Sequence, residues 1–241
     1  MNKANILTDL RRMSQPLIIA IDGPSGAGKS TLGRMLARQL GLLYIDTGSM
    51  YRAVALAVIE SGTDEKDEVA VAALAQRINI DLAGSPDAIR VTLDGRDVTE
   101  RLRDEDVTHI SSIISAIPAV RRAMVERQRE IGRRGAVMNG RDIGTVVFPH
   151  AGVKFFLTAV PEARAQRRLL EEQVHNPEAT YEETLAVMNE RDGRDTTRAD
   201  SPLVAADDAI IIDSTGELIE EVFQRMLREI ENRQSAIGNR K

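Results

Sequence analysis

With 241 residues, the chain is long enough for a full hydrophobic core that carries subdomain-sized insertions. Its formal net charge of −5 argues against a nucleic-acid-binding surface, and the absence of cysteine excludes disulfides and thiolate metal sites. No apolar run approaches the length of a membrane-spanning helix, and the first residues lack the apolar centre of a secretory signal. We therefore expect a cytoplasmic protein that handles small anions, with neither nucleic acid nor membrane as a partner.

The first structured element along the chain is expected at residues 17–21. Residues 1–15 mix polar and apolar types without strand character, and we treat them as an N-terminal tail ahead of a single domain at residues 16–236. Residues 17–21 form a short apolar run rich in β-branched residues, as in a strand buried on both faces. Apolar residues then repeat at helical spacing over residues 30–40, and Gly41 stands where a C-terminal helix cap belongs.

Four further runs have the same strand-like character, and helical patterns lie between them. The order strand, helix, strand predicts right-handed crossovers and a parallel sheet. We expect an α/β fold with about five parallel strands flanked by helices on both faces. The predicted strands after the first are residues 42–45, 136–138, 153–157 and 209–212.

Several signals mark where helices begin. A helix is expected over residues 50–59, after the second strand, and the last helix over residues 218–231. Pro118 and Pro161 suit the first turn of a helix, where a missing N–H breaks no intrahelical bond. Two pairs have the spacing of a capping box, namely Thr180 with Glu183 and Ser214 with Glu217.

Residues 63–105 do not follow the alternation of strands and helices. Apolar and polar residues alternate over residues 79–99, which is typical of strands with one buried face. The pair Asp94-Gly95 marks a tight hairpin turn within this stretch. We therefore expect a small insert with its own antiparallel strands.

The strongest motif of the sequence directly follows the first predicted strand. Residues 23–30 match G-x-x-x-x-G-K-[ST] at every fixed position. In such a loop, glycines let successive N–H groups point at phosphate oxygens, the lysine bridges the β and γ phosphates, and the serine hydroxyl reaches Mg²⁺. A glycine-rich turn that happens to precede a helix is the alternative, but the strand before it and the helix after it favour binding of ATP. The expected nucleotide-binding residues are Gly23, Pro24, Ser25, Gly26, Ala27, Gly28, Lys29, Ser30 and Thr31, with Ser30 as the metal ligand.

A phosphate-binding loop alone does not separate kinases from switches, motors or transporters. A GTP switch would be expected to carry an Asn-Lys-x-Asp element, and the only Asn-Lys pair, at residues 2–3, lacks the Asp. Motors and transporters are usually larger or bring membrane segments. The size of the chain favours a kinase that acts on a nucleotide or a metabolite.

Four sequence blocks together resemble bacterial cytidylate kinase, and the resemblance spans residues 16–230. The blocks are residues 23–31, 46–52, 140–149 and 190–198. The resemblance implies a P-loop kinase core with an acceptor-side insert at residues 63–105 and a helical lid at residues 172–199. It also implies transfer of the γ-phosphoryl group of ATP, with Mg²⁺, to CMP and dCMP, giving ADP and CDP or dCDP. We expect the chain to act as a monomer.

The resemblance further implies which residues hold the acceptor. Arginines would clamp its phosphate, and a few polar side chains would surround its base. The clamp residues are Arg52, Arg141 and Arg198. The residues that correspond to the cytosine-reading set are Ser112, Arg121 and Asp142, and those that line the acceptor pocket are Thr47 and Tyr51.

Other roles fall in the lid. Arg191 and Asp195 resemble the pair that approaches the sugar, and Arg194 a residue that reaches the donor phosphates. The expected catalytic residues are Lys29, Arg141, Arg194 and Arg198.

The residue types suit these roles on physical grounds. An arginine presents a planar fork to two phosphate oxygens and stays protonated. Residues 191, 194, 195 and 198 lie on one face if that stretch is helical, although a solvated face with intrahelical ion pairs is the alternative. Asp142 can accept from an exocyclic amine and Arg121 can donate to a ring oxygen or nitrogen, which suits cytosine. A surface turn is the alternative for Arg141 and Asp142.

One residue departs from the pattern of that family. The position before Gly140 is usually acidic there, and here it is Asn139. An amide lacks the charge with which a carboxylate would organise the water shell of the metal. Two other interpretations stay open: a related kinase with UMP or AMP as acceptor, and an ATP-binding regulatory module that closes its lid without turnover.

Overall fold

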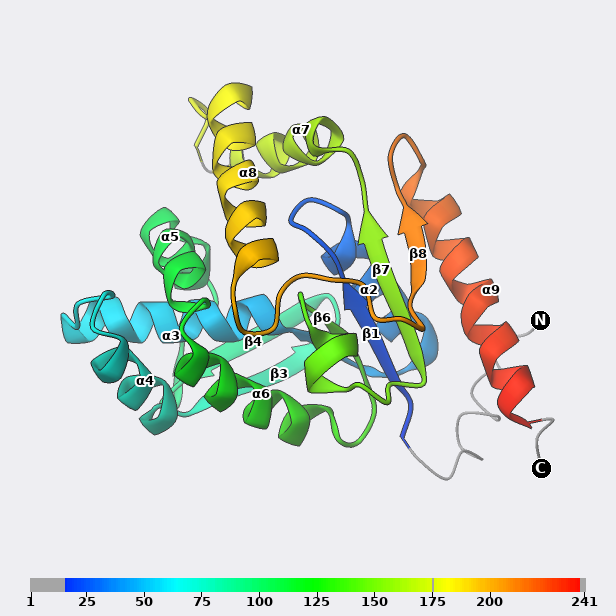
Figure 1. Cartoon of the computed structure of the whole chain (residues 1–241), viewed down its shortest axis with the longest axis horizontal. Helices are drawn as coiled ribbons and strands as arrows, with labels where there is room; N and C mark the ends of the chain where they lie inside the picture. The colour runs from blue at the N-terminus through cyan, green and yellow to red at the C-terminus, as the bar shows by residue number, and fades with distance from the viewer. Residues whose placement is uncertain (1–15, 175, 239–241) are drawn as a thin grey trace.

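The structure is a computed structural model that describes residues 16–174 and 176–238 (Figure 1). Five parallel strands form its central sheet, in the order β2-β6-β1-β7-β8. Each lies within one residue of a predicted strand, so the predicted α/β fold is confirmed, whereas the predicted tail at residues 1–15 lies outside the described residues. The strands are β1 (Ile18–Asp22), β2 (Leu43–Asp46), β6 (Ala136–Asn139), β7 (Val153–Thr158) and β8 (Ile210–Asp213).

Helices cover both faces of the sheet because successive side chains of β1 point into two different apolar clusters. Ile19 and Ile21 pack with α2 (Lys29–Leu40) and α9 (Ile219–Gly238). Ile18 and Ala20 pack on the other face with α6 (Pro118–Gly132) and the short helix η2 (Ile143–Val147). All five residues of β1 are buried, as the apolar run predicts.

The predicted insert is confirmed as a three-stranded antiparallel sheet in the order β3-β4-β5. Asp94 and Gly95 form the turn between β4 and β5, with positive φ angles of 50° and 82°, which a two-residue hairpin of this type requires. The insert elements are α4 (Glu68–Arg77), β3 (Ile80–Ser85), β4 (Ala88–Leu93), β5 (Arg96–Asp97) and the short helix η1 (Arg101–Arg103).

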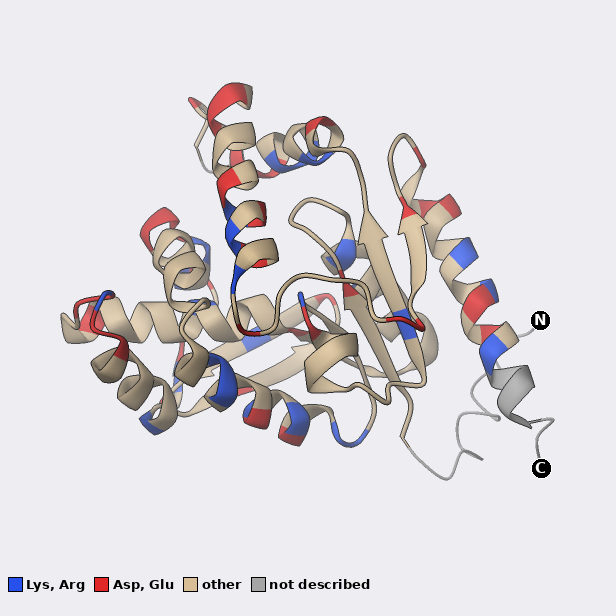
Figure 2. Ribbon diagram, in the orientation of Figure 1, with Lys and Arg blue, Asp and Glu red and all other residues tan. Residues whose placement is uncertain are grey.

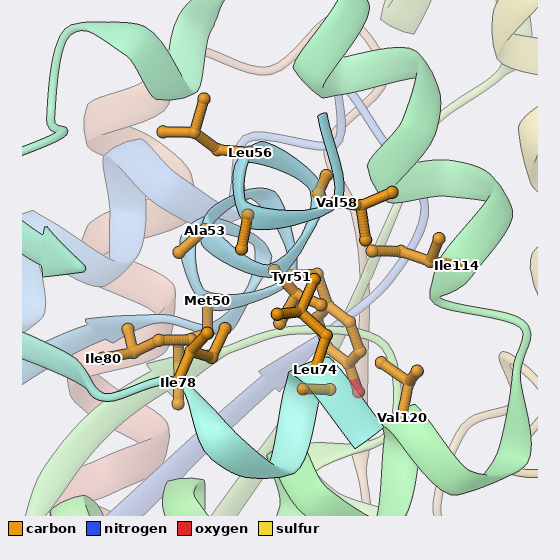
Figure 3. Close-up of a cluster of buried hydrophobic side chains, with 14 of the residues drawn as sticks. Met50, Tyr51, Ala53, Leu56, Val58, Leu74, Ile78, Ile80, Ile114 and Val120 are labelled. Carbon is orange, nitrogen blue, oxygen red and sulfur yellow. The ribbon is translucent and has the colours of Figure 1, made fainter. Parts of the chain in front are cut away.

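The insert shares its core with the helices beside it. Figure 3 shows Met50 and Tyr51 of α3 (Thr47–Ser61) in one apolar cluster with Leu74, Ile80 and Ile114. The cluster thus joins α3 to α4, to the insert sheet and to α5 (Glu105–Ile114). The predicted acceptor side is therefore fixed to the carboxyl end of β2, from which α3 starts.

Two helices, α7 (Pro161–Glu172) and α8 (Tyr181–Thr197), follow β7 (Figure 1). α8 lies within the predicted lid at residues 172–199, whereas α7 precedes it. The predicted first-turn positions of Pro118 and Pro161 are confirmed. One half of the predicted capping box at the start of α8 is confirmed, because Thr180 is the N-cap and its Oγ1 accepts from Glu183 N at 3.4 Å. The Glu183 carboxylate accepts from the Thr180 hydroxyl at 2.7 Å.

One predicted helix start and one predicted capping box are wrong. α3 begins at Thr47 rather than at residue 50, because Asp46 caps it by accepting from Gly48 N at 3.1 Å. The second predicted capping box does not form: α9 begins at Ile219, and Ser214 is buried behind the phosphate-binding loop. Its hydroxyl bonds to backbone carbonyls there, so it is not available to a helix terminus.

Within residues 16–174 and 176–238, no helix combines the length and the apolar character that crossing a membrane requires.

Candidate active site

The loop of residues 23–28 joins β1 to α2, with glycines where the backbone takes forms that other residues avoid. Gly23, Gly26 and Gly28 have φ angles of 144°, 73° and 88°. A Cβ atom at Gly23 would lie 2.0 Å from Leu157 O, and one at Gly26 would lie 2.8 Å from Arg164 O. The loop is therefore shaped by close backbone contact with β7 and α7, which only glycine permits.

Four successive carbonyls of this loop are held by hydrogen-bond donors. Lys29 Nζ donates to Pro24 O at 2.5 Å, and Arg164 and Arg167 donate to Ser25 O and Gly26 O at 3.0 and 3.5 Å. Ser214 Oγ donates to Ala27 O at 3.4 Å. A loop whose carbonyls are engaged in this way keeps its N–H groups for an anion, which is the property of a phosphate-binding nest.

Positive charge from three elements converges on this loop. Burial, and then the charges of Arg141 and Arg191, hold the pKa of Lys29 well below its ordinary value. Burial and the neighbouring Arg141 likewise lower the pKa of Arg191 to about 10. A bound anion would stabilise cations held this close together, so Lys29, Arg141 and Arg191 mark a candidate anion site.

The predicted clamp arginines are bonded to carboxylates. Arg52 Nη2 pairs with Asp46 Oδ2 at 3.1 Å, and Arg141 Nε with Asp195 Oδ2 at 2.8 Å. Arg198 Nη1 lies 3.4 Å from Asp195 Oδ1, while its Nη2 is buried without a partner among the described residues. Burial opposes ionisation of Asp195, but Arg141, Arg191 and Arg198 outweigh it and hold its pKa low. The structure thus brings two of the three clamp arginines onto one carboxylate.

Two of the three residues expected to read the base, Arg121 and Asp142, meet each other. They form a buried ion pair, and the Arg121 guanidinium stacks 5.6 Å from the centre of the Tyr51 ring. Burial raises the pKa of Tyr51 to about 12, so the ring stays neutral beside this pair. Tyr51 belongs to the apolar cluster of Figure 3 and touches the candidate site through Arg121. Its contact with the acceptor stays a prediction.

Arg194, expected at the donor phosphates, is bonded to two other side chains. Its Nη2 donates to Ser112 Oγ at 2.9 Å and its Nη1 pairs with Glu190 at 2.8 Å. The guanidinium therefore bridges α8 to α5 on the acceptor side. A contact with the donor phosphates stays a prediction and requires these bonds to break. The predicted helical spacing is confirmed, because α8 includes residues 191, 194 and 195 and ends with Arg198 as its cap.

Three polar side chains meet at the carboxyl end of β6. Asn139 Nδ2 donates to Ser30 Oγ at 3.1 Å, and Asn139 Oδ1 is buried without a partner among the described residues. Thr47 Oγ1 donates to Asn139 O at 2.9 Å, so its hydroxyl joins α3 to β6. Thr47 therefore positions Asn139, and its contact with the acceptor stays a prediction.

Sequence reasoning missed Asp22, the last residue of β1. Its carboxylate is buried and accepts from Ile143 N and Gly144 N at 2.8 and 2.7 Å, which fixes the turn that carries Arg141 and Asp142. Burial raises its pKa to about 6, although the two N–H groups act in the opposite direction. Its position at the carboxyl end of a central strand could have revealed it, because α/β sheets bind their ligands at that edge.

Known proteins match this sequence along nearly the whole chain. The family model for cytidylate kinase matches residues 19–232. The chain is 47% identical over 218 residues to the cytidylate kinase of Geobacter sp. (strain M21), covering 90% of this chain and 94% of that protein. It is 49% identical over 216 residues to the cytidylate kinase of Desulfitobacterium hafniense (strain Y51), covering 89% and 93%. Because the match runs through the phosphate-binding loop, the insert and the lid, the chain belongs to the cytidylate kinase family of nucleoside monophosphate kinases.

Proposed function

We propose that the protein transfers the γ-phosphoryl group of ATP to the α-phosphate of CMP, and of dCMP, giving ADP and CDP or dCDP. The observation that carries the proposal is the convergence of Lys29, Arg141 and Arg191 in a protein whose net charge is −5. Two phosphorylated molecules repel each other, and concentrated positive charge between them offsets that repulsion.

The acceptor needs no general base. The second pKa of a phosphate monoester is about 6, so the attacking oxygen is already ionised at neutral pH. The residues then act by positioning and by neutralising charge. Lys29 would hold the β and γ phosphates of the donor while Arg52, Arg141 and Arg198 hold the acceptor phosphate.

Asp46 and Asp195 keep these arginines in place when no phosphate is bound. Arg52 and Arg141 are only 26% and 18% exposed in their side chains, and each already has a carboxylate partner. An acceptor phosphate would add a second anion to arginines whose orientation is set beforehand. Preorganisation of this kind lowers the entropic cost of binding.

The residues present fit a Mg²⁺ ion that has only one or two protein ligands. Among the described residues, no three His, Asp or Glu side chains gather to hold a metal ion. Mg²⁺ usually keeps several waters and binds one or two protein oxygens together with substrate phosphates. Ser30 Oγ would be the protein ligand, and the unpartnered Asn139 Oδ1 is placed to accept from a bound water. When bound, the ion would neutralise charge on the donor phosphates.

Arg121 and Asp142 would select the base. Asp142 presents an acceptor to the exocyclic amine of cytosine, and Arg121 presents donors to its ring oxygen or nitrogen. Uracil carries an oxygen in place of that amine, so UMP would face a carboxylate with a second acceptor. We therefore expect CMP to be a better acceptor than UMP.

The lid would close on the two nucleotides and exclude water, which would otherwise hydrolyse ATP. We propose that one monomer suffices, because the residues discussed above all come from one chain. A cytoplasmic location is part of the same proposal.

A panel of acceptors tests this function. The purified protein is incubated with ATP, Mg²⁺ and one of CMP, dCMP, UMP or AMP, and nucleotides are separated by chromatography. We expect CDP and dCDP in amounts equal to the ADP released, and much slower turnover of UMP and AMP. ADP release without a new diphosphate would support a regulatory ATP-binding module instead, and preferential turnover of UMP or AMP would replace the assigned acceptor.

A further inference from the structure

Arg164, in the first turn of α7, connects three separate parts of the molecule. Its Nε donates to Ala159 O at 3.0 Å. Its Nη1 donates both to Ser25 O at 3.0 Å and to Asp192 Oδ2 at 2.5 Å. The side chain is only 6% exposed, so these bonds form where water competes weakly. A single nitrogen thus joins the phosphate-binding loop to the lid helix α8.

On the loop side, α7 is in direct contact with the phosphate-binding loop. A Cβ atom at Gly26 would lie 2.9 Å from Arg164 Cβ, so the loop backbone touches the helix directly. Arg167, one turn along, donates to Ser214 Oγ at 3.0 Å and to Ser214 O at 2.6 Å. The start of α7 therefore follows any movement of residues 25 and 26.

On the lid side, α8 is attached to α7 at both ends. Thr184 Oγ1 donates to Glu172 Oε2 at 2.9 Å at the outer end. At the inner end the attachment is the ion pair of Arg164 with Asp192. Asp192 is the immediate neighbour of Arg191, and Figure 2 shows basic and acidic residues interleaved along this part of α8. The inner attachment therefore sits among the lid residues that would touch the nucleotides.

We propose that Arg164 is a positioning residue that couples occupation of the phosphate-binding loop to the placement of the lid helix. Ser25 O and the Gly26 N–H belong to one peptide unit. A phosphate that accepts from this N–H makes the carbonyl a stronger acceptor for Arg164, and Arg164 in turn strengthens the N–H as a donor. The same guanidinium holds Asp192, so an ordered loop also fixes the positions of Arg191 and Asp195 on α8. This inference rests on the proposed function, because it takes a nucleotide triphosphate as the occupant of the loop.

Two variants and a matched control separate coupling from simple stability. Asp192→Asn removes the charge on the lid side and leaves every contact of the loop intact. Arg164→Lys keeps the buried positive charge but lacks the fork that reaches Ser25 O, Ala159 O and Asp192 together. Asp208→Asn is the control, because Asp208 is the carboxylate partner of another buried cation, Lys154, at 2.7 Å. It lies outside the lid and the phosphate-binding loop.

Movement of the lid can be followed directly, because the chain contains no cysteine. Val69 on α4 and Val187 on α8 are 80% and 61% exposed, so Val69→Cys and Val187→Cys give a pair of sites for donor and acceptor dyes. Energy transfer is recorded while ATP and Mg²⁺ are titrated without CMP. The same labelled proteins are then assayed for CDP formation.

In the parent protein we expect ATP to change the energy transfer. Asp192→Asn should lose at least half of that change and lower kcat about tenfold, and because the coupling is reciprocal its ATP affinity should fall by a few-fold at most. Arg164→Lys should weaken ATP binding as well, whereas Asp208→Asn should behave as the parent. An unchanged ATP response and kcat in Asp192→Asn would overturn the coupling, as would an equal loss in Asp208→Asn. CDP formation by the parent tests the proposed function separately, so the two failures are distinguishable.

Discussion

The donor side and the acceptor side of the candidate site are built in different ways. The donor side is one contiguous loop, residues 23–30, whose backbone shape is set by glycines and by donors to its carbonyls. The acceptor side is made of side chains from α3, α6, α8 and the turn after β6, among them Arg52, Arg121, Arg141 and Arg198. These arginines are held by carboxylates before any substrate arrives.

The difference decides which buried cations have a carboxylate partner before substrate binds. On the donor side, Lys29 is buried, lies near Arg141 and Arg191, and forms no ion pair with a carboxylate among the described residues, so its charged form is disfavoured until phosphate binds. On the acceptor side, Asp46, Asp142 and Asp195 compensate the arginines in advance. We therefore expect donor-side substitutions to remove activity without loss of stability, and acceptor-side substitutions to affect both.

Lys29→Ala should have the largest effect. Loss of the cation at the transferred phosphate should lower kcat about a hundredfold to a thousandfold, as for other preorganised charges in active sites. The melting temperature should stay equal or rise, because the repulsion from Arg141 and Arg191 disappears. Lys154→Ala, at a buried lysine outside the site, should show the reverse, with lower stability and normal turnover. Near-normal activity in Lys29→Ala would contradict this account of the donor side.

Asp22 should make stability depend on pH. Its pKa is about 6 in the folded protein against an ordinary value of 3.8, so the folded state keeps a proton that the unfolded state loses between these values. Stability should therefore fall as pH rises through this window, by about 3 kcal/mol relative to Asp22→Asn. Urea unfolding of both proteins at pH 4, 5, 6 and 7 measures this difference. A difference that is constant with pH would mean that the carboxylate is not buried as described.

Asp142→Asn addresses the acceptor side alone. The amide has nearly the same size but loses the charge that Arg121 and the cytosine amine would share, so KM for CMP should rise roughly tenfold. KM for ATP should stay the same, and the melting temperature should fall because Arg121 loses its buried ionic partner. Steady-state kinetics with each nucleotide varied in turn gives both constants. An equal rise in the two KM values would remove Asp142 from recognition of the base.

The exposed ion pair between Arg38 of α2 and Asp87 of the insert should have the smallest effect. Both side chains are more than half exposed, so Arg38→Gln should change the free energy of unfolding by less than about 1 kcal/mol. Catalytic constants should not change. A large loss of stability would indicate that the insert depends on this contact more than on the shared apolar cluster.

The sequence predicted the donor side better than the acceptor side for a physical reason. The backbone conformation of residues 23–30 follows from local glycines, and the strands follow from local apolar runs, so a short window suffices. The partner of Arg141 is Asp195, 54 residues away, and no local pattern specifies such a pair. Ser214 failed as a helix cap for the same reason, because carbonyls from the phosphate-binding loop and from β7 occupy its hydroxyl. Arg194 was placed at the donor phosphates from the resemblance, whereas its bonds in the structure go to Ser112 and Glu190.

The most direct test of a single site for two phosphorylated molecules is calorimetric titration with cytidine and adenosine joined by five phosphates. We expect one molecule to bind per chain, at least about a hundredfold more tightly than ATP, since it occupies both sides at once. Lys29→Ala and Arg141→Met should each weaken this binding. Two molecules per chain, or an affinity no higher than that of ATP, would contradict the presence of such a site.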